Sequence, residues 1–204
     1  MGTRERRERE KEQRREAILD AARKLFWARG YERATMPQIA DAAEVAPGTL
    51  YLYFPSKEAL YAELLVEGYG RLGERLREAV QADGSPREQG EALIDGFLGF
   101  AREHPEYFDI IFFTVQREGR AVTGLALDAE QRSSLLAAEA ACRSVATGVL
   151  ERAGVPPEAA VHRVQAVWSM LAGIVLYFVR DDAATFAAVA REARALILKG
   201  VFEP

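Results

Sequence analysis

The segment from Thr35 to Ser56 restricts the fold of this chain most, because helix-start and helix-stop residues divide it at short intervals. Thr35 and Gln38 have the spacing of a capping box, in which each side chain bonds the other residue's backbone N–H. Pro47 is compatible with the first turn of a further helix, since its missing N–H has no helical partner there. Pro55 ends that helix after about two turns, and Ser56 can cap the next one. The segment therefore predicts two short helices joined by a tight turn, the layout of a helix-turn-helix.

Helical periodicity extends through the rest of the chain, and we find no alternating pattern typical of a strand. An apolar stripe predicts a first helix that ends at Gly30, and apolar residues at four-residue steps predict one long helix over residues 57–80. Residues 117–127 are predicted to form a loop. Five further helices are predicted, over residues 86–102, 106–115, 128–153, 158–179 and from Asp181 or Asp182 to Lys199. The fold class is therefore predicted as all-α, with about nine helices.

Composition excludes several classes of protein. With 204 residues, 49% of them hydrophobic, the chain can bury a substantial core. The single cysteine, Cys142, excludes a disulfide framework and is predicted to be a small buried apolar residue. His104 and His162 are isolated, and no nucleophile–base pair or metal-ligand cluster is found, so we expect no enzyme, no cofactor and no metal. No apolar run reaches 18 residues and none lies near the N-terminus, which predicts a cytoplasmic protein without a membrane partner.

Charge is distributed unevenly along the chain. The net charge is −4, yet residues 1–35 hold 11 Lys or Arg against 7 acids. A cationic front and an anionic rear indicate two parts with different partners. Interleaved Glu and Arg over residues 3–16 are typical of a solvated helix with i,i+4 pairs, such as Glu5–Arg9 and Glu10–Arg14. A basic arm that touches DNA phosphates is the alternative, and the two interpretations can both hold.

The front of the chain resembles the DNA-binding domain of the TetR family of repressors, almost continuously over residues 14–65. Beyond residue 80 only length and helix count match that family. The residues that carry the resemblance are Ala17–Phe26 (AILDAARKLF), Gly30-Tyr31, Thr35, Ile39-Ala40, Val45–Phe54 (VAPGTLYLYF) and Ser56–Leu60 (SKEAL).

The resemblance implies an N-terminal three-helix helix-turn-helix DNA-binding domain, residues 1–60, and a C-terminal helical bundle for ligand binding and dimerisation, residues 61–204. It implies a homodimeric repressor that binds a palindromic double-stranded DNA operator and is released by a ligand. Ala46-Pro47 departs from the family pattern, and Pro47 lacks a donor, so specificity is expected to depend on DNA shape or on arginines of the N-terminal arm. The implied DNA contacts are Thr35, Tyr51 and Lys57 to phosphates, Gly48 and Thr49 to base edges, Tyr53 to bases or backbone, and Gln38 as a further contact.

Aromatic residues concentrate in two stretches of the rear part and predict an apolar ligand pocket, although each of them could instead be ordinary core. Arg102 or Arg117 could hold an acidic head group, and we expect no buried acid within the aromatic runs. These features favour an acyl-CoA or fatty acid as effector, with a hydrophobic drug or aromatic compound as the alternative. The predicted pocket residues are Phe97, Phe100, Arg102, Tyr107, Phe108, Phe112, Arg117, Trp168, Leu171 and Tyr177.

Small and apolar residues over 158–179 and 182–199 suit close packing across a two-fold axis, and in the family these helices form the dimer interface. Two rival classes remain open at this point. One is an architectural DNA-binding protein without an effector, which a test of ligand-dependent DNA affinity would separate from the regulator. The other is an enzyme built on a helical bundle, which a co-purifying metal or cofactor would favour.

Overall fold

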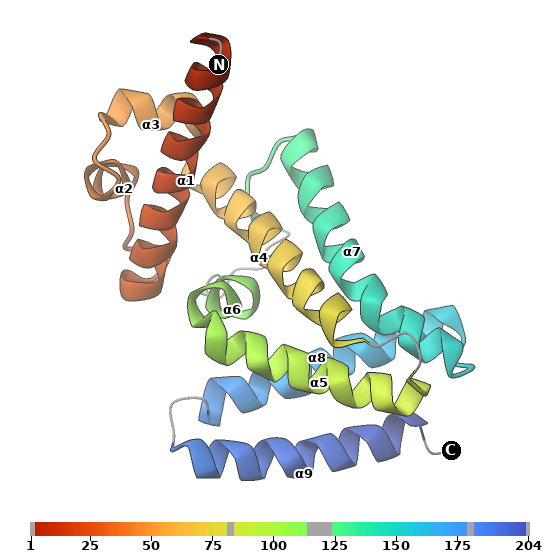
Figure 1. The fold of residues 1–204 in the computed structure, drawn as a ribbon. Helices are drawn as coiled ribbons and strands as arrows, with labels where there is room; N and C mark the ends of the chain where they lie inside the picture. Colours follow the sequence, from red (N-terminus) through yellow and green to blue (C-terminus); the bar gives the residue numbers. More distant parts are fainter. Residues whose placement is uncertain (1–2, 81–83, 114–123, 179–181, 203–204) are drawn as a thin grey trace. The chain divides into compact units, whose positions relative to one another are not determined.

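The computed structural model describes residues 3–80, 84–113, 124–178 and 182–202, and in these ranges the chain forms nine α-helices and no strand (Figure 1). The prediction of an all-α fold is therefore confirmed. The helices are α1 (Thr3–Arg29), α2 (Met36–Ala42), α3 (Pro47–Tyr53), α4 (Lys57–Ala79), α5 (Pro86–Glu103), α6 (Pro105–Phe112), α7 (Ala129–Arg152), α8 (Pro157–Phe178) and α9 (Ala183–Phe202).

Packing divides the chain into two compact units that do not follow the order of the sequence. The first unit consists of residues 1–68 and 106–135, and the second consists of residues 69–105 and 136–204. Helix α6, which lies in the rear half of the chain, thus packs with the N-terminal helices from residue 106 onward. The domain boundary at residue 60 stays a prediction, since these units are defined by packing rather than by function.

Capping boxes begin both α2, as the sequence predicts, and α5. The Gln38 backbone N–H donates to Thr35 Oγ1 at 3.4 Å, and the Thr35 N–H donates to Gln38 Oε1 at 3.1 Å. At α5 the Ser85 N–H donates to Glu88 Oε2 at 2.8 Å, and the hydrogen bonds from the Ser85 side chain and backbone lower the pKa of Glu88. These helix starts depend on residues only three positions apart, so they can be predicted from the sequence.

The turn between α2 and α3 depends on a residue in the left-handed region. Glu44 has φ 55°, a conformation that costs a non-glycine residue about 1–2 kcal/mol. Two hydrogen bonds hold it there, from the Glu44 N–H to the Asp41 carbonyl at 3.0 Å and from the Val45 N–H to the Ala40 carbonyl at 2.9 Å. The second bond closes a Schellman-type end of α2. The sequence predicts the turn but not this conformation.

The core of the first unit contains a cluster of three aromatic rings. Phe26, Tyr31 and Tyr61 are buried, with ring centroids 5.1–5.8 Å apart. Tyr61 Oη donates to the Ile110 carbonyl of α6 at 2.5 Å. A Cβ on Gly68 would lie 3.1 Å from the Ile111 side chain, so glycine at this position permits the close approach of α4 and α6.

Two expectations about α6 need correction. The helix ends at Phe112 rather than at residue 115, and residues 114–123 lie outside the described residues. The expectation that no acid is buried among the aromatic residues is wrong, because Asp109 is 6% exposed. The physical reason is that α6 is enclosed on several sides, so that all residues from 107 to 111 are buried whatever their polarity.

In the second unit, α4 and α7 cross closely, and a Cβ on Gly73 would lie 3.3 Å from the Cys142 Cα atom. Burial raises the pKa of the Cys142 thiol to about 12. The thiol is therefore protonated at neutral pH and behaves as a small apolar side chain, as predicted. By length and composition alone, α8 is also apolar enough to cross a membrane, a test that core helices of soluble proteins pass as well.

Candidate DNA-binding surface and apolar pocket

Helix α3 is anchored on one side and open on the other. Leu50 is fully buried and fixes α3 against the first unit, whereas Tyr51 is 49% exposed. No atom lies within 4 Å of the position that a Cβ on Gly48 would occupy. Thr49 and Tyr53 are half-buried beside this open face. The start of α3 can therefore approach another molecule closely with its backbone and side chains.

Leu52 is a surface residue that the sequence does not mark as a site residue. It is 86% exposed on α3 and lies four residues after Gly48, on the same side of the helix. A leucine this exposed offers an apolar contact to whatever α3 meets. The four-residue spacing is the signal that could have identified it.

Thr35 and Gln38 are exposed at the start of α2, next to the turn that follows α1. Their hydrogen bonds in the capping box leave the Thr35 hydroxyl proton and the Gln38 amide group able to donate to a further acceptor. The box therefore positions two donors on the surface and begins α2 at the same time.

Lys57 makes structural contacts that its predicted role, binding a phosphate, does not require. Its Nζ donates to the carbonyls of Tyr31 at 2.8 Å, Glu32 at 3.4 Å and Ala34 at 3.2 Å. The ammonium also lies 4.2 Å from the centre of the Tyr31 ring. Because a lysine has three N–H donors, these carbonyls occupy all of them. Lys57 thus ties the start of α4 to the α1–α2 connection, and its contact with a phosphate stays a prediction.

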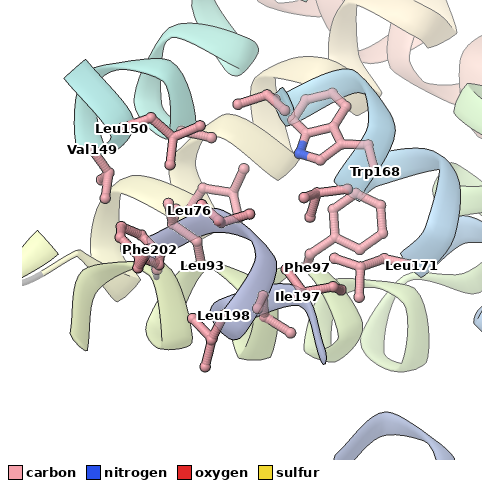
Figure 2. A pocket seen from close by; sticks show the side chains of 16 residues that line it. Leu76, Leu93, Phe97, Val149, Leu150, Trp168, Leu171, Ile197, Leu198 and Phe202 are labelled. Carbon is pink, nitrogen blue, oxygen red and sulfur yellow. The ribbon is translucent and has the colours of Figure 1, made fainter. Parts of the chain in front are cut away.

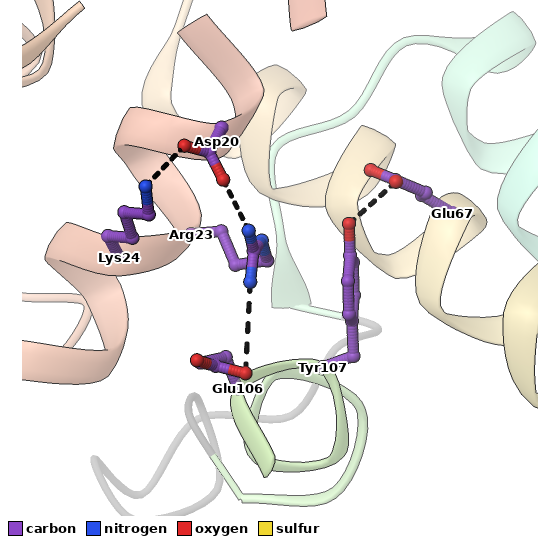
Figure 3. Close-up of polar contacts among 6 residues, drawn as sticks. All are labelled: Asp20, Arg23, Lys24, Glu67, Glu106 and Tyr107. Atoms are coloured by element: carbon purple, nitrogen blue, oxygen red, sulfur yellow. Dashed lines mark hydrogen bonds and ion pairs between the residues drawn. The ribbon is translucent and has the colours of Figure 1, made fainter. Parts of the chain in front are cut away.

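Polar side chains connect α6 to α1 and α4 within the first unit (Figure 3). Arg23 Nη1 lies 3.7 Å from Glu106 Oε2, and its guanidinium lies 4.9 Å from the centre of the Tyr107 ring. Tyr107 Oη donates to Glu67 Oε1 at 2.6 Å. The Lys24 ammonium, 2.7 Å from Asp20, and then Arg23 hold the pKa of the Asp20 carboxyl below its ordinary value.

The second unit contains an apolar cavity of about 50 Å³ that brings together three of the predicted pocket residues, Phe97, Trp168 and Leu171 (Figure 2). The Phe97 and Trp168 rings lie 5.8 Å apart between centroids. The other lining residues come from α4, α5, α7, α8 and α9, and they are Leu76, Gly90, Leu93, Ile94, Ala146, Val149, Leu150, Val164, Val167, Ile197, Leu198, Val201 and Phe202. Every side chain that lines the cavity is apolar except for the Trp168 indole N–H.

Gly90 makes room for the end of α9 at this cavity. A Cβ at Gly90 would lie 2.7 Å from the Phe202 ring, which is closer than real Cβ contacts come. The neighbouring Gln89 is buried, and its Oε1 accepts a hydrogen bond from Arg152 Nη2 at 2.8 Å. Sequence reasoning missed this polar pair beside the cavity, because Gln89 precedes the aromatic run.

The remaining predicted pocket residues are not among the residues that line this cavity. Phe100 is buried against the His104 ring, with centroids 5.3 Å apart, and the Arg102 guanidinium lies 6.0 Å from the Phe186 ring centre. Tyr107, Phe108 and Phe112 belong to the first unit, where the last two rings lie 4.6 Å apart. Arg117 lies outside the described residues.

Tyr177 lies in a second, open groove between α8 and α9. The groove measures about 560 Å³, and its lining is almost entirely apolar but includes Arg163. Met170 is 49% exposed, Tyr177 75% and Leu196 72%. An exposed apolar surface of this kind on two adjacent helices is typical of an interaction site.

The sequence matches models of two protein domains. Residues 18–64 match the model of bacterial regulatory proteins of the tetR family, and residues 91–198 match a tetracyclin repressor-like C-terminal domain. The second match alone covers more than half of the chain. The two matches fall on the helix-turn-helix and on the helices that surround the apolar cavity.

Among proteins of similar sequence is the transcriptional activator FasR of Mycolicibacterium smegmatis, 32% identical over 102 residues, which are 50% of this chain and 47% of FasR. The fatty acid metabolism regulator protein of Bacillus subtilis is 35% identical over 77 residues, 38% of this chain and 40% of that protein. The chain thus matches less than half the length of these relatives.

Two solved structures share the fold over nearly the whole chain. FadR from Bacillus subtilis in complex with stearoyl-CoA has a TM-score of 0.70 at 20% identity, over 91% of this chain and 98% of FadR. AibR in complex with isovaleryl coenzyme A and operator DNA has a TM-score of 0.68 at 20% identity, over 94% and 99%. At this identity the likeness concerns the fold alone. Together, the two domain matches and the helix-turn-helix geometry show that the chain belongs to the TetR family of bacterial regulatory proteins.

Proposed function

We propose that the protein is a ligand-responsive transcriptional repressor, which binds a palindromic operator as a homodimer and releases it when an acyl-CoA or fatty acid occupies the second unit. The observation that carries the proposal is the geometry of α3. Leu50 is fully buried and anchors this helix, while Gly48 and Tyr51 are exposed and Thr49 lies half-buried beside them, on the helix that enters a major groove in helix-turn-helix proteins.

In this proposal the groove-facing residues read bases and the flanking residues hold phosphates. The open space at Gly48 lets the α3 backbone approach the base edges, and the Thr49 hydroxyl donates to or accepts from them. The Leu52 side chain supplies an apolar contact suited to a thymine methyl group. Tyr51, Tyr53, Thr35 and Gln38 contribute donors to the DNA backbone or to bases at its edge.

Substitutions at Thr49 and Tyr51 should affect DNA binding in different ways. Thr49→Ala is expected to change which bases are preferred at one position of each half-site, because base contacts specify sequence. Tyr51→Phe is expected to weaken binding to all duplexes by a similar factor, because phosphate contacts carry no sequence information. Selection of duplexes from a random pool by each variant measures both effects. An unchanged preference in Thr49→Ala would contradict the role of Thr49.

The cavity supports an effector with an alkyl chain. Its lining offers almost no hydrogen-bonding group, so it can bind methylene groups but not a polar ligand. The cavity of about 50 Å³ has room for only about three to five water-sized groups. A long acyl chain therefore has to separate the lining helices, and a ligand that favours the opened state shifts the protein toward it. The relatives named for fatty acid metabolism and the FadR complex with stearoyl-CoA agree with this choice.

Titration of a protein–operator complex with acyl-CoAs of increasing chain length tests the proposal. Fluorescence anisotropy of a labelled operator should show release, with potency rising about fourfold per added methylene, at about 0.8 kcal/mol each. Release by hydrophobic drugs or aromatic compounds but not by acyl chains would favour the alternative effector. DNA binding that no ligand changes would favour an architectural protein. Because FasR is named as an activator, a reporter gene behind the operator is needed to establish the sign of regulation.

The homodimer in this proposal uses the α8–α9 groove. Met170, Tyr177 and Leu196 expose apolar surface along both helices, and Gly173 and Gly200 among the lining residues allow helices of a second copy to approach closely. A two-fold axis through this surface would pair it with itself, as an isologous interface requires. The two copies of α3 would then address the two halves of a palindrome.

A further inference from the structure

The N-terminal half of α1 carries three cations in one row along the helix. The helix runs without interruption from Thr3, so residues at i, i+4 and i+7 share one side. Arg7, Lys11 and Arg14 have this spacing, and the same row continues into Ile18 and Ala22, which are fully buried. The side of α1 that faces the core of the first unit is thus apolar at Ile18 and Ala22 and cationic nearer the N-terminus.

Four of the five acidic residues of this helix segment lie on a different side. Glu5, Glu8, Glu12 and Glu16 follow one another at i, i+3, i+7 and i+11, roughly 140° around the axis from the cationic row at 100° per residue. The separation is incomplete, since Glu10 lies about 60° around the axis from Arg7, and Arg9 lies on the acidic side. Pairs at i,i+4 are present, with Arg4–Glu8 at 3.0 Å and Arg6–Glu10 at 2.9 Å, so Glu10 pairs with Arg6 and not with Arg14 as expected.

The cationic row is available for a partner. Arg7, Lys11 and Arg14 are exposed, and within the described ranges no ion pair is recorded for any of them. The adjacent Arg15, by contrast, pairs with Glu12 at 3.5 Å and also with Glu63. The structure therefore uses Arg15 inside the first unit and leaves the three upstream cations facing solvent.

The row begins next to the recognition helix. The Arg15 guanidinium lies 5.7 Å from the centre of the ring of Phe54, the residue that caps the C-terminus of α3. Arg14 is therefore within one residue of the contact between α1 and the end of α3. From Arg7 to Arg14 the helix advances about 10 Å, which is close to the axial rise over three phosphate-to-phosphate steps on one strand, at about 3.4 Å each.

We propose that Arg7, Lys11 and Arg14 form a phosphate-binding stripe that contacts the DNA flanking the bases read by α3. This inference rests on the proposed function, since it needs α3 in the groove of an operator. Duplex DNA is the partner favoured here because the stripe lies on the part of α1 next to the C-terminal end of α3, and because the front of the chain is cationic while the rest is anionic. The stripe extends the contact area on DNA beyond the helix-turn-helix itself.

A matched pair of variants of the full chain tests the stripe. Arg7→Ala/Arg14→Ala removes two charges from it, and Arg6→Ala/Arg9→Ala removes the same charge from other sides of the same exposed helix segment. Alanine favours helix at all four positions, and circular dichroism checks that α1 is retained. Affinity for an operator, selected with the unaltered protein from random duplexes, is measured as a function of salt concentration. The measurement is made on a minimal duplex and on one with flanking base pairs.

The stripe variant should lower the slope of log affinity against log salt by about 0.9 per lost phosphate contact, hence by about 3.6 for a dimer. It should also lose the gain in affinity that flanking base pairs give the unaltered protein. The Arg6/Arg9 variant should keep both properties. Equal behaviour of the two variants, or a stripe variant with the unaltered slope, would overturn the inference. Failure of the unaltered protein to select or bind any duplex would instead contradict the proposed function.

Discussion

Ala146→Leu is expected to make the protein nearly insensitive to its effector while operator binding is retained. Ala146 lies on α7, is 8% exposed and lines the apolar cavity, so a leucine there extends into the space that the effector needs. If the larger side chain displaces three or four methylene groups of an acyl chain, the loss is about 0.8 kcal/mol for each. The concentration of acyl-CoA needed for half-release should therefore rise about 100-fold.

The matched control is Ala140→Leu, which adds the same atoms to an exposed position on the same helix. It should respond to acyl-CoA like the unaltered protein. The melting temperature of Ala146→Leu should change little, because the cavity accepts part of the new side chain. A normal response in Ala146→Leu, together with an unaltered melting temperature, would show that the effector binds elsewhere.

Among substitutions at the DNA-binding surface, Lys57→Met is expected to lower the free energy of unfolding most. Methionine keeps an apolar stem against the Tyr31 ring, but the carbonyls of Tyr31, Glu32 and Ala34 lose their donor. Loss of hydrogen bonds to a charged group at this partly buried position should cost about 2–3 kcal/mol in total. For a chain of this size that corresponds to a fall in melting temperature of roughly 5–10 °C.

Operator affinity of Lys57→Met should fall at least tenfold. Without Lys57 the α1–α2 connection is no longer tied to the start of α4, so it no longer holds α2 in position. Lys24→Met serves as control, since Lys24 is 69% exposed and pairs with Asp20 on the surface. The result distinguishes two roles of Lys57. An unaltered melting temperature with a salt slope lowered by about one contact per protomer would favour the direct phosphate contact that the family resemblance implies.

The helix-turn-helix was predictable because its boundaries are set by neighbours in sequence. The Thr35–Gln38 box and Pro47 act within three or four residues, and both are found in the structure where the sequence predicts them. The φ of Glu44 was not predictable, since a glutamate in the left-handed region is retained only by hydrogen bonds that the finished turn provides. Likewise the role of Lys57 depends on carbonyls some 25 residues away in the chain.

The pocket was predicted less well because aromatic content does not indicate which neighbours a side chain meets. Phe97 and Phe108 have the same chemistry and lie eleven positions apart, yet one lines the cavity of the second unit and the other is core of the first. Only the packing of α6 with α1 and α4 decides this, through long-range contacts such as Tyr61 to Ile110. The aliphatic residues that complete the cavity carry no sequence signal that separates them from ordinary core.

The attachment of α6 to α1 has a consequence for protein engineering. A chimera joined near residue 60, with its front from one family member and its rear from another, would keep the contacts of α6 to Tyr61 and Glu67 within a single parent. The contacts of Arg23 with Glu106 and Tyr107 would instead be made between residues of different parents. A rear half is therefore compatible when it has an acid at the position of Glu106 and an aromatic residue at that of Tyr107. Any other rear half has to be joined together with the α1 of its own parent.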